Sequence, residues 1–329
     1  MKRIGITVPF DGLSLLEHRE PLARLCEAGY GEVSTGEVNA LDGVTPLILF
    51  SAWQPQLTLS VGIVSAFTRG PGVLAMTAAA MAEAAPGKAR FGIGAGSDRV
   101  VEGWNGIPFA KPYSRVANTL RFLRGVLATG RAERGAEELG SKGFRLTRLP
   151  EVPPQLLIAA LGPKMQQLAK AEADGVILNF LSPGDVRLIA DHTAGTAREL
   201  DAPLEVEARV FVIPGSDSAA ELAARRHIAA YLTVPVYTEF QRWLGRGAQI
   251  EPLLEAWNGG DRKRAVELVP DELVSDLFVM GTPAECAAGV ARYLDAGVDI
   301  ATIAFLPPFG RELSAREQVD FLCAMAESV

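Results

Sequence analysis

The stretch LIAALGPKMQQLAKAEADGVILNF, residues 157–180, holds two apolar runs with one helix-like segment between them. The first run ends at Gly162 and Pro163, a pair that is typical of a helix start. Apolar residues then recur near a period of 3.6 up to Gly175, where the second apolar run begins. Near-continuous apolar runs of this length are typical of parallel strands that are buried on both faces. The stretch therefore predicts a β-α-β unit.

The same alternation of strand-like and helix-like segments continues along almost the whole chain. The strand-like runs are 3–10, 32–37, 57–65, 89–96, 155–161, 175–181, 204–213 and 300–306. Eight such units predict an α/β fold of the (β/α)8 TIM-like barrel type, with a doubly wound sheet as the main alternative. We expect a single barrel domain over residues 1–329, with a charged excursion at about 131–153 and a helical insertion at about 234–280.

Composition and charge narrow the classes of partner. The 329 residues are 48% hydrophobic and 22% charged, with a formal net charge of −7, which argues against a nucleic-acid partner. No run approaches the ~18 consecutive apolar residues of a transmembrane helix. The first ten residues, MKRIGITVPF, resemble a strand rather than a secretory signal. We therefore expect a cytoplasmic protein with no membrane partner.

Metal-binding spacings do not occur in the sequence. The three cysteines are scattered and form no C-x-x-C motif. His18, His192 and His227 fall in charged, helix-like segments, where we expect surface positions, and no pair has the spacing of a zinc site. The sequence predicts no metal site.

Glycine and polar residues gather where the predicted strands end, which is the catalytic face of a barrel. Gly94, Ala95, Gly96 and Ser97 follow the fourth run. Read as G-x-G-x-x-G from Gly92, this motif has Ser97 at its third glycine, which disfavours a Rossmann dinucleotide site. The glycines suit either a close approach of backbone N–H groups to an anion or flat ring, or tight packing alone.

Two more strand ends carry candidate binding residues. Gly62 interrupts a β-branched strand, which indicates a bulge or a close backbone approach. Arg69 follows it and suits either an anion or a structural ion pair. Gly162 and Lys164 stand at a helix start whose free N–H groups and dipole suit a phosphate, although an ordinary turn with a surface lysine has the same sequence.

Taken in order, the motifs FTRGP, GIGAGS, WNGIPFAKPYSR, IAALGPKMQQLAKAEADGVILN and GTPAECAAGVARYLDAGVD resemble the bacterial luciferase-like superfamily. The similarity is greatest to the branch that uses the deazaflavin coenzyme F420, and it covers nearly the whole chain. The resemblance implies a TIM-like barrel, a deazaflavin or flavin at the strand ends, and a homodimer.

The resemblance also assigns residues to the cofactor. It implies a non-prolyl cis peptide between Gly62 and Ile63, in a bulge that backs the ring, and a phosphate-binding helix start at 162–165. The cofactor-binding residues expected on this basis are Gly62, Ile63, Val64, Ser65, Arg69, Gly94, Ala95, Gly96, Ser97, Ala160, Gly162, Pro163, Lys164 and Met165.

The chain departs from the sugar-phosphate dehydrogenases of this branch at two catalytic positions. Those enzymes carry an Asp-His pair after the second strand, where this chain has Glu37 and Val38. They carry a glutamate after the fourth-strand glycines, where this chain has Ser97. The imidazole and the carboxylate that would move protons are therefore missing. The remaining polar candidates for catalysis are Glu37, Asn39 and Ser97.

These features favour an oxidoreductase that transfers a hydride between coenzyme F420 and a small organic substrate, with the cofactor supplying the chemistry. Two alternatives stay open. One is an FMN-dependent two-component monooxygenase on the same fold, and the other is a non-catalytic deazaflavin- or flavin-binding protein. Tyr237, Phe240, Trp243 and Trp257 in the insertion predict either an aromatic substrate pocket or core packing.

Overall fold

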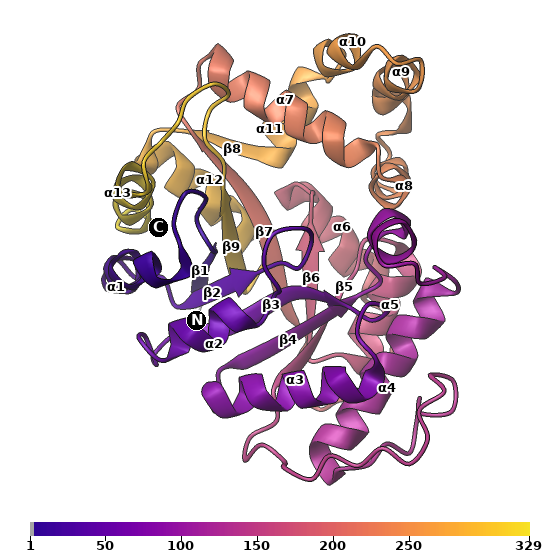
Figure 1. Cartoon of the computed structure of the whole chain (residues 1–329). Helices are drawn as coiled ribbons and strands as arrows, with labels where there is room; N and C mark the ends of the chain where they lie inside the picture. The colour runs from indigo at the N-terminus through magenta and orange to yellow at the C-terminus, as the bar shows by residue number, and fades with distance from the viewer. Residues whose placement is uncertain (1–2) are drawn as a thin grey trace.

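The computed structural model describes residues 3–329, and their strands form a closed parallel barrel (Figure 1). The strands are β1 (Arg3–Thr7), β2 (Glu32–Thr35), β3 (Thr58–Ser65), β4 (Ala89–Gly94), β5 (Gln155–Ala159), β6 (Gly175–Asn179), β7 (Glu205–Pro214), β8 (Phe278–Gly281) and β9 (Ile300–Phe305). β1 to β7 pair in chain order, and β9 pairs with both β7 and β1, which closes a ring of eight strands. The predicted (β/α)8 barrel is confirmed.

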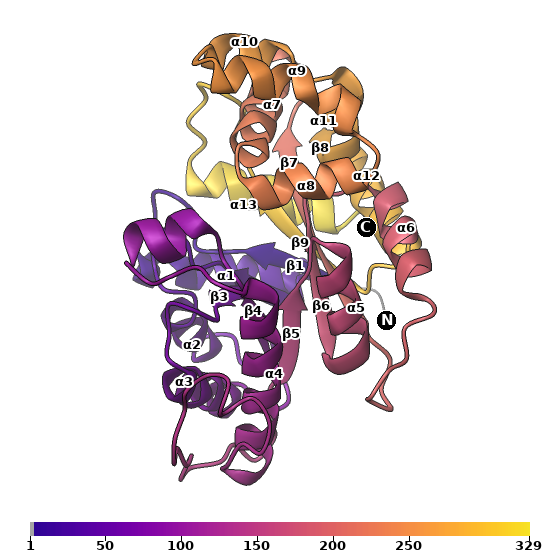
Figure 2. The ribbon, with the colours of Figure 1, turned by 90° about the vertical axis from the view of Figure 1, so that its right-hand side faces the viewer.

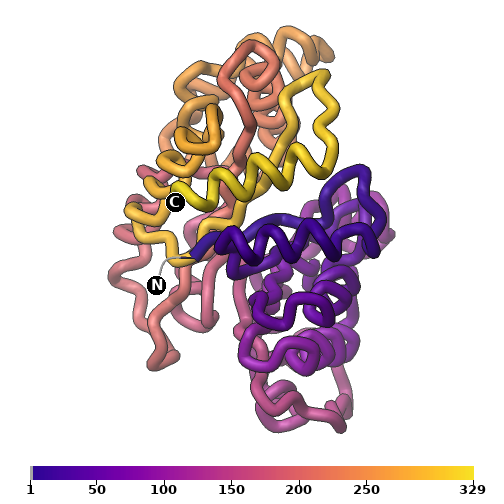
Figure 3. Tube along the Cα trace, turned by 90° about the vertical axis from the view of Figure 1, so that its left-hand side faces the viewer, coloured from indigo at the N-terminus to yellow at the C-terminus, as the bar shows by residue number. Residues whose placement is uncertain are grey.

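Helices cover the outside of the barrel. They are Leu15–His18 (a 3-10 turn), α1 (Arg19–Glu27), α2 (Thr45–Ser51), α3 (Pro71–Ala84), Arg99–Trp104 (a π-helical turn), α4 (Pro112–Thr129), α5 (Pro163–Glu172), α6 (Pro183–Thr193), α7 (Ser218–Leu232), α8 (Pro235–Trp243), α9 (Gly247–Asn258), α10 (Arg262–Glu267), α11 (Asp271–Leu277), α12 (Pro283–Asp295) and α13 (Ala315–Ala326). Figure 2 shows α7 to α11 gathered at one end of the molecule, and in Figure 3 α13 lies beside α1. Among residues 3–329, no helix is both long and apolar enough to cross a membrane.

The insertion at 234–280 contains α8 to α11 and one strand that the sequence analysis does not predict, β8. β9 occupies one edge of β7, while β6 pairs with the other edge only over residues 205–209. β8 pairs with residues 211–214 on the edge that β6 leaves free. The expected helical insertion is present as α8 to α11. The strand at its end was not predicted, because a run of four residues is too short to show a periodic pattern and its partner strand lies far away in the chain. The excursion at 131–153 contains turns without helix or strand.

Ion pairs, rather than apolar side chains, fill the amino-terminal half of the barrel interior. Arg90 is 1% exposed, and its guanidinium lies 3.3 Å from both Glu32 and Glu207 and forms an ion pair with Glu205. Three carboxylates therefore share Arg90, with Arg3 as a second partner of Glu205. Complete burial, reinforced by the charge of Glu207, raises the pKa of Glu32 to about 8 in spite of Arg90. Since this cluster occupies the amino-terminal half, we look for the site at the carboxyl ends of the strands, where barrel enzymes hold their ligands.

The raised pKa of Glu32 predicts a pH-dependent stability. The Glu32 carboxyl keeps its proton up to about pH 8 in the folded chain but ionises near its ordinary value of 4.5 when unfolded. The folded state therefore binds an extra proton between these values, and the free energy of unfolding falls as the pH rises through this interval. We expect Glu32→Gln to remove most of this slope, measured by urea unfolding at several pH values. An unchanged slope would assign the pH dependence to another group.

Candidate active site

A bulge in β3 lies opposite β4 at the carboxyl end of the barrel. The pairing register shifts between Val61 and Val64, and the peptide between Gly62 and Ile63 is cis, as predicted. Val61 and Val64 are fully buried, whereas Gly62 and Ile63 are half-buried. The bulge therefore presents an apolar surface in the mouth of the barrel.

Two glycines of β4 make room for this bulge. A Cβ on Gly92 would lie 2.3 Å from the carbonyl oxygen of Val61 and 2.6 Å from Cδ1 of Ile177, so no larger residue fits without movement. A Cβ on Gly94 would lie 3.1 Å from the side chain of Ile63. Packing against the bulge thus accounts for both glycines, which is the second of the two interpretations that the sequence leaves open.

The end of β2 contacts the bulge through Glu37. Its backbone N–H donates to the carbonyl oxygen of Ile63 over 3.3 Å. Its carboxylate forms an ion pair with Arg69 and accepts a hydrogen bond from the N–H of Gly43 over 3.0 Å. Asp42 lies a further 3.8 Å from the Arg69 guanidinium. Arg69 therefore makes the structural ion pair that was the alternative to anion binding.

The polar residues near the end of β4 also have local partners. Ser97 Oγ accepts a hydrogen bond from the N–H of Val100 over 3.3 Å, at the start of the π-helical turn. The buried Ser65 Oγ donates to the carbonyl of Ala95 over 3.1 Å. Gly96 has a φ of 74°, in the left-handed region that favours glycine. Asn39 is exposed. Ser97 thus serves as a local cap, and Asn39 faces solvent.

The amino terminus of α5 is open toward the barrel mouth. Gly162 is the N-cap residue, and no side chain caps the helix. A Cβ built on Gly162 would meet nothing within 4 Å, so there is free space in front of this turn. Lys164 is exposed, while Pro163 and Met165 are half-buried, and Ala160 is fully buried beneath them. An uncapped helix terminus with a lysine beside open space suits an anion.

Sequence analysis missed a polar pair at the ends of β6 and β7. Asn179 and Arg209 are register partners on these neighbouring strands, and the amide Nδ2 of Asn179 donates to the hydroxyl of Tyr237 over 3.0 Å. One signal was present in the sequence, since charged residues recur with period 2 at Glu205, Glu207 and Arg209 in an otherwise apolar strand. That period marks one face of the strand, and only the fold shows that the face lines the barrel.

The aromatic residues of the insertion divide between the two predicted roles. Tyr237 contacts Asn179 at the strand ends, whereas Phe240 is 1% exposed and stacks on Trp243. The guanidinium of Arg262 lies over the ring of Trp257, at 5.3 Å. Only Tyr237 therefore reaches the candidate site.

The histidines differ from the expectation of surface positions. His18 is fully buried, and both ring nitrogens have partners: Nε2 accepts from the N–H of Phe10 over 2.8 Å and Nδ1 donates to the carbonyl of Ser14 over 2.9 Å. Burial lowers the pKa of His18. His192 and His227 are half-buried. Within residues 3–329, no group of three or more His, Cys, Asp or Glu side chains is arranged to hold a metal.

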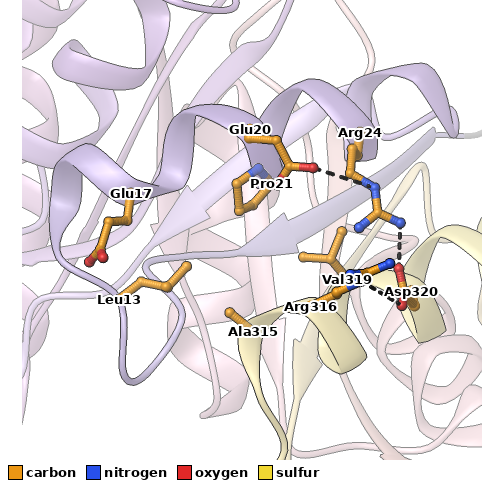
Figure 4. Close-up of a pocket in the computed structure, with 9 residues that line it drawn as sticks. All are labelled: Leu13, Glu17, Glu20, Pro21, Arg24, Ala315, Arg316, Val319 and Asp320. Carbon is orange, nitrogen blue, oxygen red and sulfur yellow. Dashed lines mark hydrogen bonds and ion pairs between the residues drawn. The ribbon is translucent and has the colours of Figure 1, made fainter.

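A hollow of about 610 Å³ lies between α1 and α13, on the outer helical layer (Figure 4). Four of its five charged side chains pair with one another, and the fifth, Glu17, accepts a hydrogen bond from the N–H of Ser14 over 2.7 Å. Arg24 forms ion pairs with Asp320 and with Glu20, and Arg316 lies 3.9 Å from Asp320. Since these charges are compensated within the hollow, we place the candidate active site at the strand ends instead.

Residues 9–300 match the family model of the luciferase-like monooxygenases. The chain belongs to this family. A Mycobacterium tuberculosis protein whose name describes a coenzyme F420-dependent oxidoreductase is 25% identical over 314 residues, which cover 87% of this chain and 90% of that protein. The 5,10-methylenetetrahydromethanopterin reductase of Methanolobus tindarius is 24% identical over 302 residues, 88% of this chain and 90% of the relative.

Among solved structures, the luciferase-like barrel is similar to the coenzyme F420-dependent tetrahydromethanopterin reductase of Methanopyrus kandleri. The TM-score is 0.73 at 20% sequence identity, and the match covers 99% of this chain and 98% of the other. At this identity the similarity concerns the fold.

The packing of the bulge predicts that substitution of Gly92 destabilises the fold more than substitution of a glycine with free space around it. We expect Gly92→Ala to lower the free energy of unfolding by about 3 kcal/mol, because the added Cβ meets a backbone carbonyl that cannot rotate away. Gly31→Ala is the control, since a Cβ there meets nothing within 4 Å, and we expect a change within about 0.5 kcal/mol. Chemical denaturation of both variants measures the difference. Equal effects would contradict the packing role.

Proposed function

We propose that this protein is an oxidoreductase that transfers a hydride between coenzyme F420 and a small organic substrate. The observation that carries the proposal is the half-buried bulge at Gly62 and Ile63, which offers an apolar platform for a flat ring in the barrel mouth. The names of the F420-dependent relatives support the choice of cofactor. When bound, the deazaflavin supplies the carbon that accepts or donates the hydride.

The residues present fit such a cofactor in two places. Ile63 is half-buried and exposes apolar surface, and Gly94, which has no Cβ, leaves room for the Ile63 side chain. At the start of α5, the open space at Gly162 and the exposed Lys164 fit the phosphate of the cofactor tail. The protein's own contribution is to bind and orient both reactants and to limit the access of water.

We assign no proton transfer to the polar candidates of the sequence analysis. Glu37 is engaged by Arg69 and by the N–H of Gly43, Ser97 caps a turn, and Asn39 faces solvent. We propose that Glu37 and Arg69 instead hold the β2 and β3 ends against the bulge. The expected homodimer stays a prediction, and Val73 and Met76 of α3, 48% and 50% exposed, are apolar side chains that a partner would cover.

The proposed function is tested by identifying which cofactor the protein binds. We expect the protein, purified from a host that makes deazaflavins, to retain F420, and to bind F420 at least about tenfold more tightly than FMN in fluorescence titrations. Tighter binding of FMN, with oxygen-dependent turnover, would support the monooxygenase instead. Binding of either cofactor without any turnover would support a carrier.

The start of α5 gives a second prediction. We expect Lys164→Glu to weaken F420 binding by about tenfold or more, because a carboxylate replaces an ammonium group beside the phosphate. Lys170→Glu, at the other end of the same helix, makes the same charge change and serves as the control. We expect it to leave the F420 dissociation constant unchanged. Equal effects of the two variants would argue against a phosphate at Gly162.

A further inference from the structure

Two polar side chains project into the barrel just beyond the bulge. On β6, Ile177 lies within reach of Gly62, and on β7, Glu207 accepts a hydrogen bond from Ser60 inside the barrel. Side chains alternate along a strand, so the residues two positions further on face the same interior. These residues are Asn179 and Arg209, and they are register partners. They therefore lie side by side about 6–7 Å nearer to the mouth than Ile177.

Three buried polar atoms here lack partners among residues 3–329. They are Oδ1 of Asn179, Nε of Arg209 and Nε2 of His227. Buried donors and acceptors are almost always hydrogen-bonded, so a group of three unpaired atoms calls for an explanation. Arg209 is half-buried and forms no ion pair with any residue between 3 and 329, and its guanidinium lies over the ring of Phe211, at 5.6 Å. The site therefore has a positive charge without a counter-charge.

Aromatic side chains surround this charge. The rings of Phe211 and Tyr231 each lie 4.8 Å from His227, and Tyr231 lies 4.7 Å from Tyr237. Burial and the nearby Arg209 lower the pKa of His227 to about 4, so this imidazole is neutral at physiological pH and adds no second charge. The Tyr237 hydroxyl accepts from Asn179, which leaves its own proton free to donate.

The backbone at this point is held in an unusual conformation. Phe180, which follows Asn179, has a φ of 61°, in the left-handed region that non-glycine residues rarely adopt. The side-chain amide of Gln241 donates to the carbonyl of Phe180 over 2.8 Å, and the Phe180 ring stacks on Tyr231 at 4.6 Å. Such strain persists where surrounding structure enforces it, and it is concentrated at functional sites.

Solvent reaches the group from one side. A hollow of about 500 Å³ between α7 and residues 306–312 has His227 and Leu306 in its wall. His227, whose ring contacts Phe211 and Tyr231, thus stands between this hollow and the aromatic group.

We propose that Arg209 and Tyr237, whose hydroxyl Asn179 holds in place, bind the carboxylate of an organic-acid substrate whose apolar part packs against the surrounding aromatic rings. This inference rests on the proposed function, of which it names the substrate class. A guanidinium is planar and matches a carboxylate with two hydrogen bonds, and the Tyr237 hydroxyl adds a third donor. One unpaired cation balances the single charge of a carboxylate, whereas a phosphate dianion would call for a second one.

The experiment uses benzoate and its uncharged isostere benzamide as probes, titrated calorimetrically into the protein with and without F420. We expect benzoate to bind at least about tenfold more tightly than benzamide, and Arg209→Met to abolish that preference. Arg209→Lys should keep part of it, because the charge remains while the two-point contact is lost. Arg187→Met, an exposed cation on α6, is the matched control.

Two further readouts separate this role from a structural one. Arg209 is half-buried and has no ion-pair partner among residues 3–329, so we expect Arg209→Met to leave the melting temperature unchanged or higher, whereas loss of a structural contact would lower it. Tyr237→Phe removes only a hydroxyl and should weaken benzoate binding without changing that of benzamide, which keeps the test decisive if Arg209→Met does not fold.

Equal affinities for benzoate and benzamide would overturn the inference. So would a tenfold loss of F420 affinity in Arg209→Met, because Arg209 would then belong to the cofactor. If the wild-type protein binds no F420 but still prefers benzoate through Arg209, the proposed function fails and the carboxylate site stands.

Discussion

The carboxyl end of this barrel depends on how the bulged β3 packs against β4. The carbonyl of Val61 and the side chain of Ile177 occupy the space where residue 92 would carry a Cβ, so that position accommodates only glycine. Gly94 in turn leaves room for Ile63, and the N–H of Glu37 holds the Ile63 carbonyl. One local irregularity thus joins three strands and positions an apolar surface in the barrel mouth. A regular β3 would bury those side chains between strands and helices and leave no platform.

The charged side chains in the two halves of the barrel interior differ in whether they have ion-pair partners. In the amino-terminal half, Arg90 is shared among three carboxylates, and only the Arg90 Nε and the Glu32 carboxyl of this cluster lack a hydrogen bond within the described residues, where burial favours the protonated acid of Glu32. In the carboxyl half, Arg209 has no carboxylate partner among residues 3–329. Arg90 is buried and needs these carboxylates, whereas Arg209 is half-buried and keeps its charge without one. The ion cluster around Arg90 therefore fills the amino-terminal half of the barrel interior. We assign the charge of Arg209 to ligand binding.

The insertion after α7 matters because β6 and β7 part near their ends. β6 pairs with β7 only as far as Arg209, and β8 takes the same edge from residue 211 onward. The chain between α7 and β8 is thereby anchored at the barrel rim, where α7 and α8 bring Tyr231 and Tyr237 beside Asn179. A segment that looks peripheral in the sequence thus supplies part of the candidate site.

The sequence by itself determined the order and type of the main elements. Several parallel strands buried on both faces are near-continuously apolar, and their regular alternation with amphipathic helices made the eight barrel strands recognisable. Pro163 and Pro283 mark helix starts because proline needs no N–H partner there. The resemblance to a family, rather than local propensity, located the cis peptide at Gly62. Only the tertiary structure decided that Arg69 pairs with Glu37, that Gly92 faces a carbonyl of β3, and that Arg209 meets Asn179 without a counter-charge. These facts depend on which distant segments become neighbours, and local sequence patterns reach only a few residues along the chain.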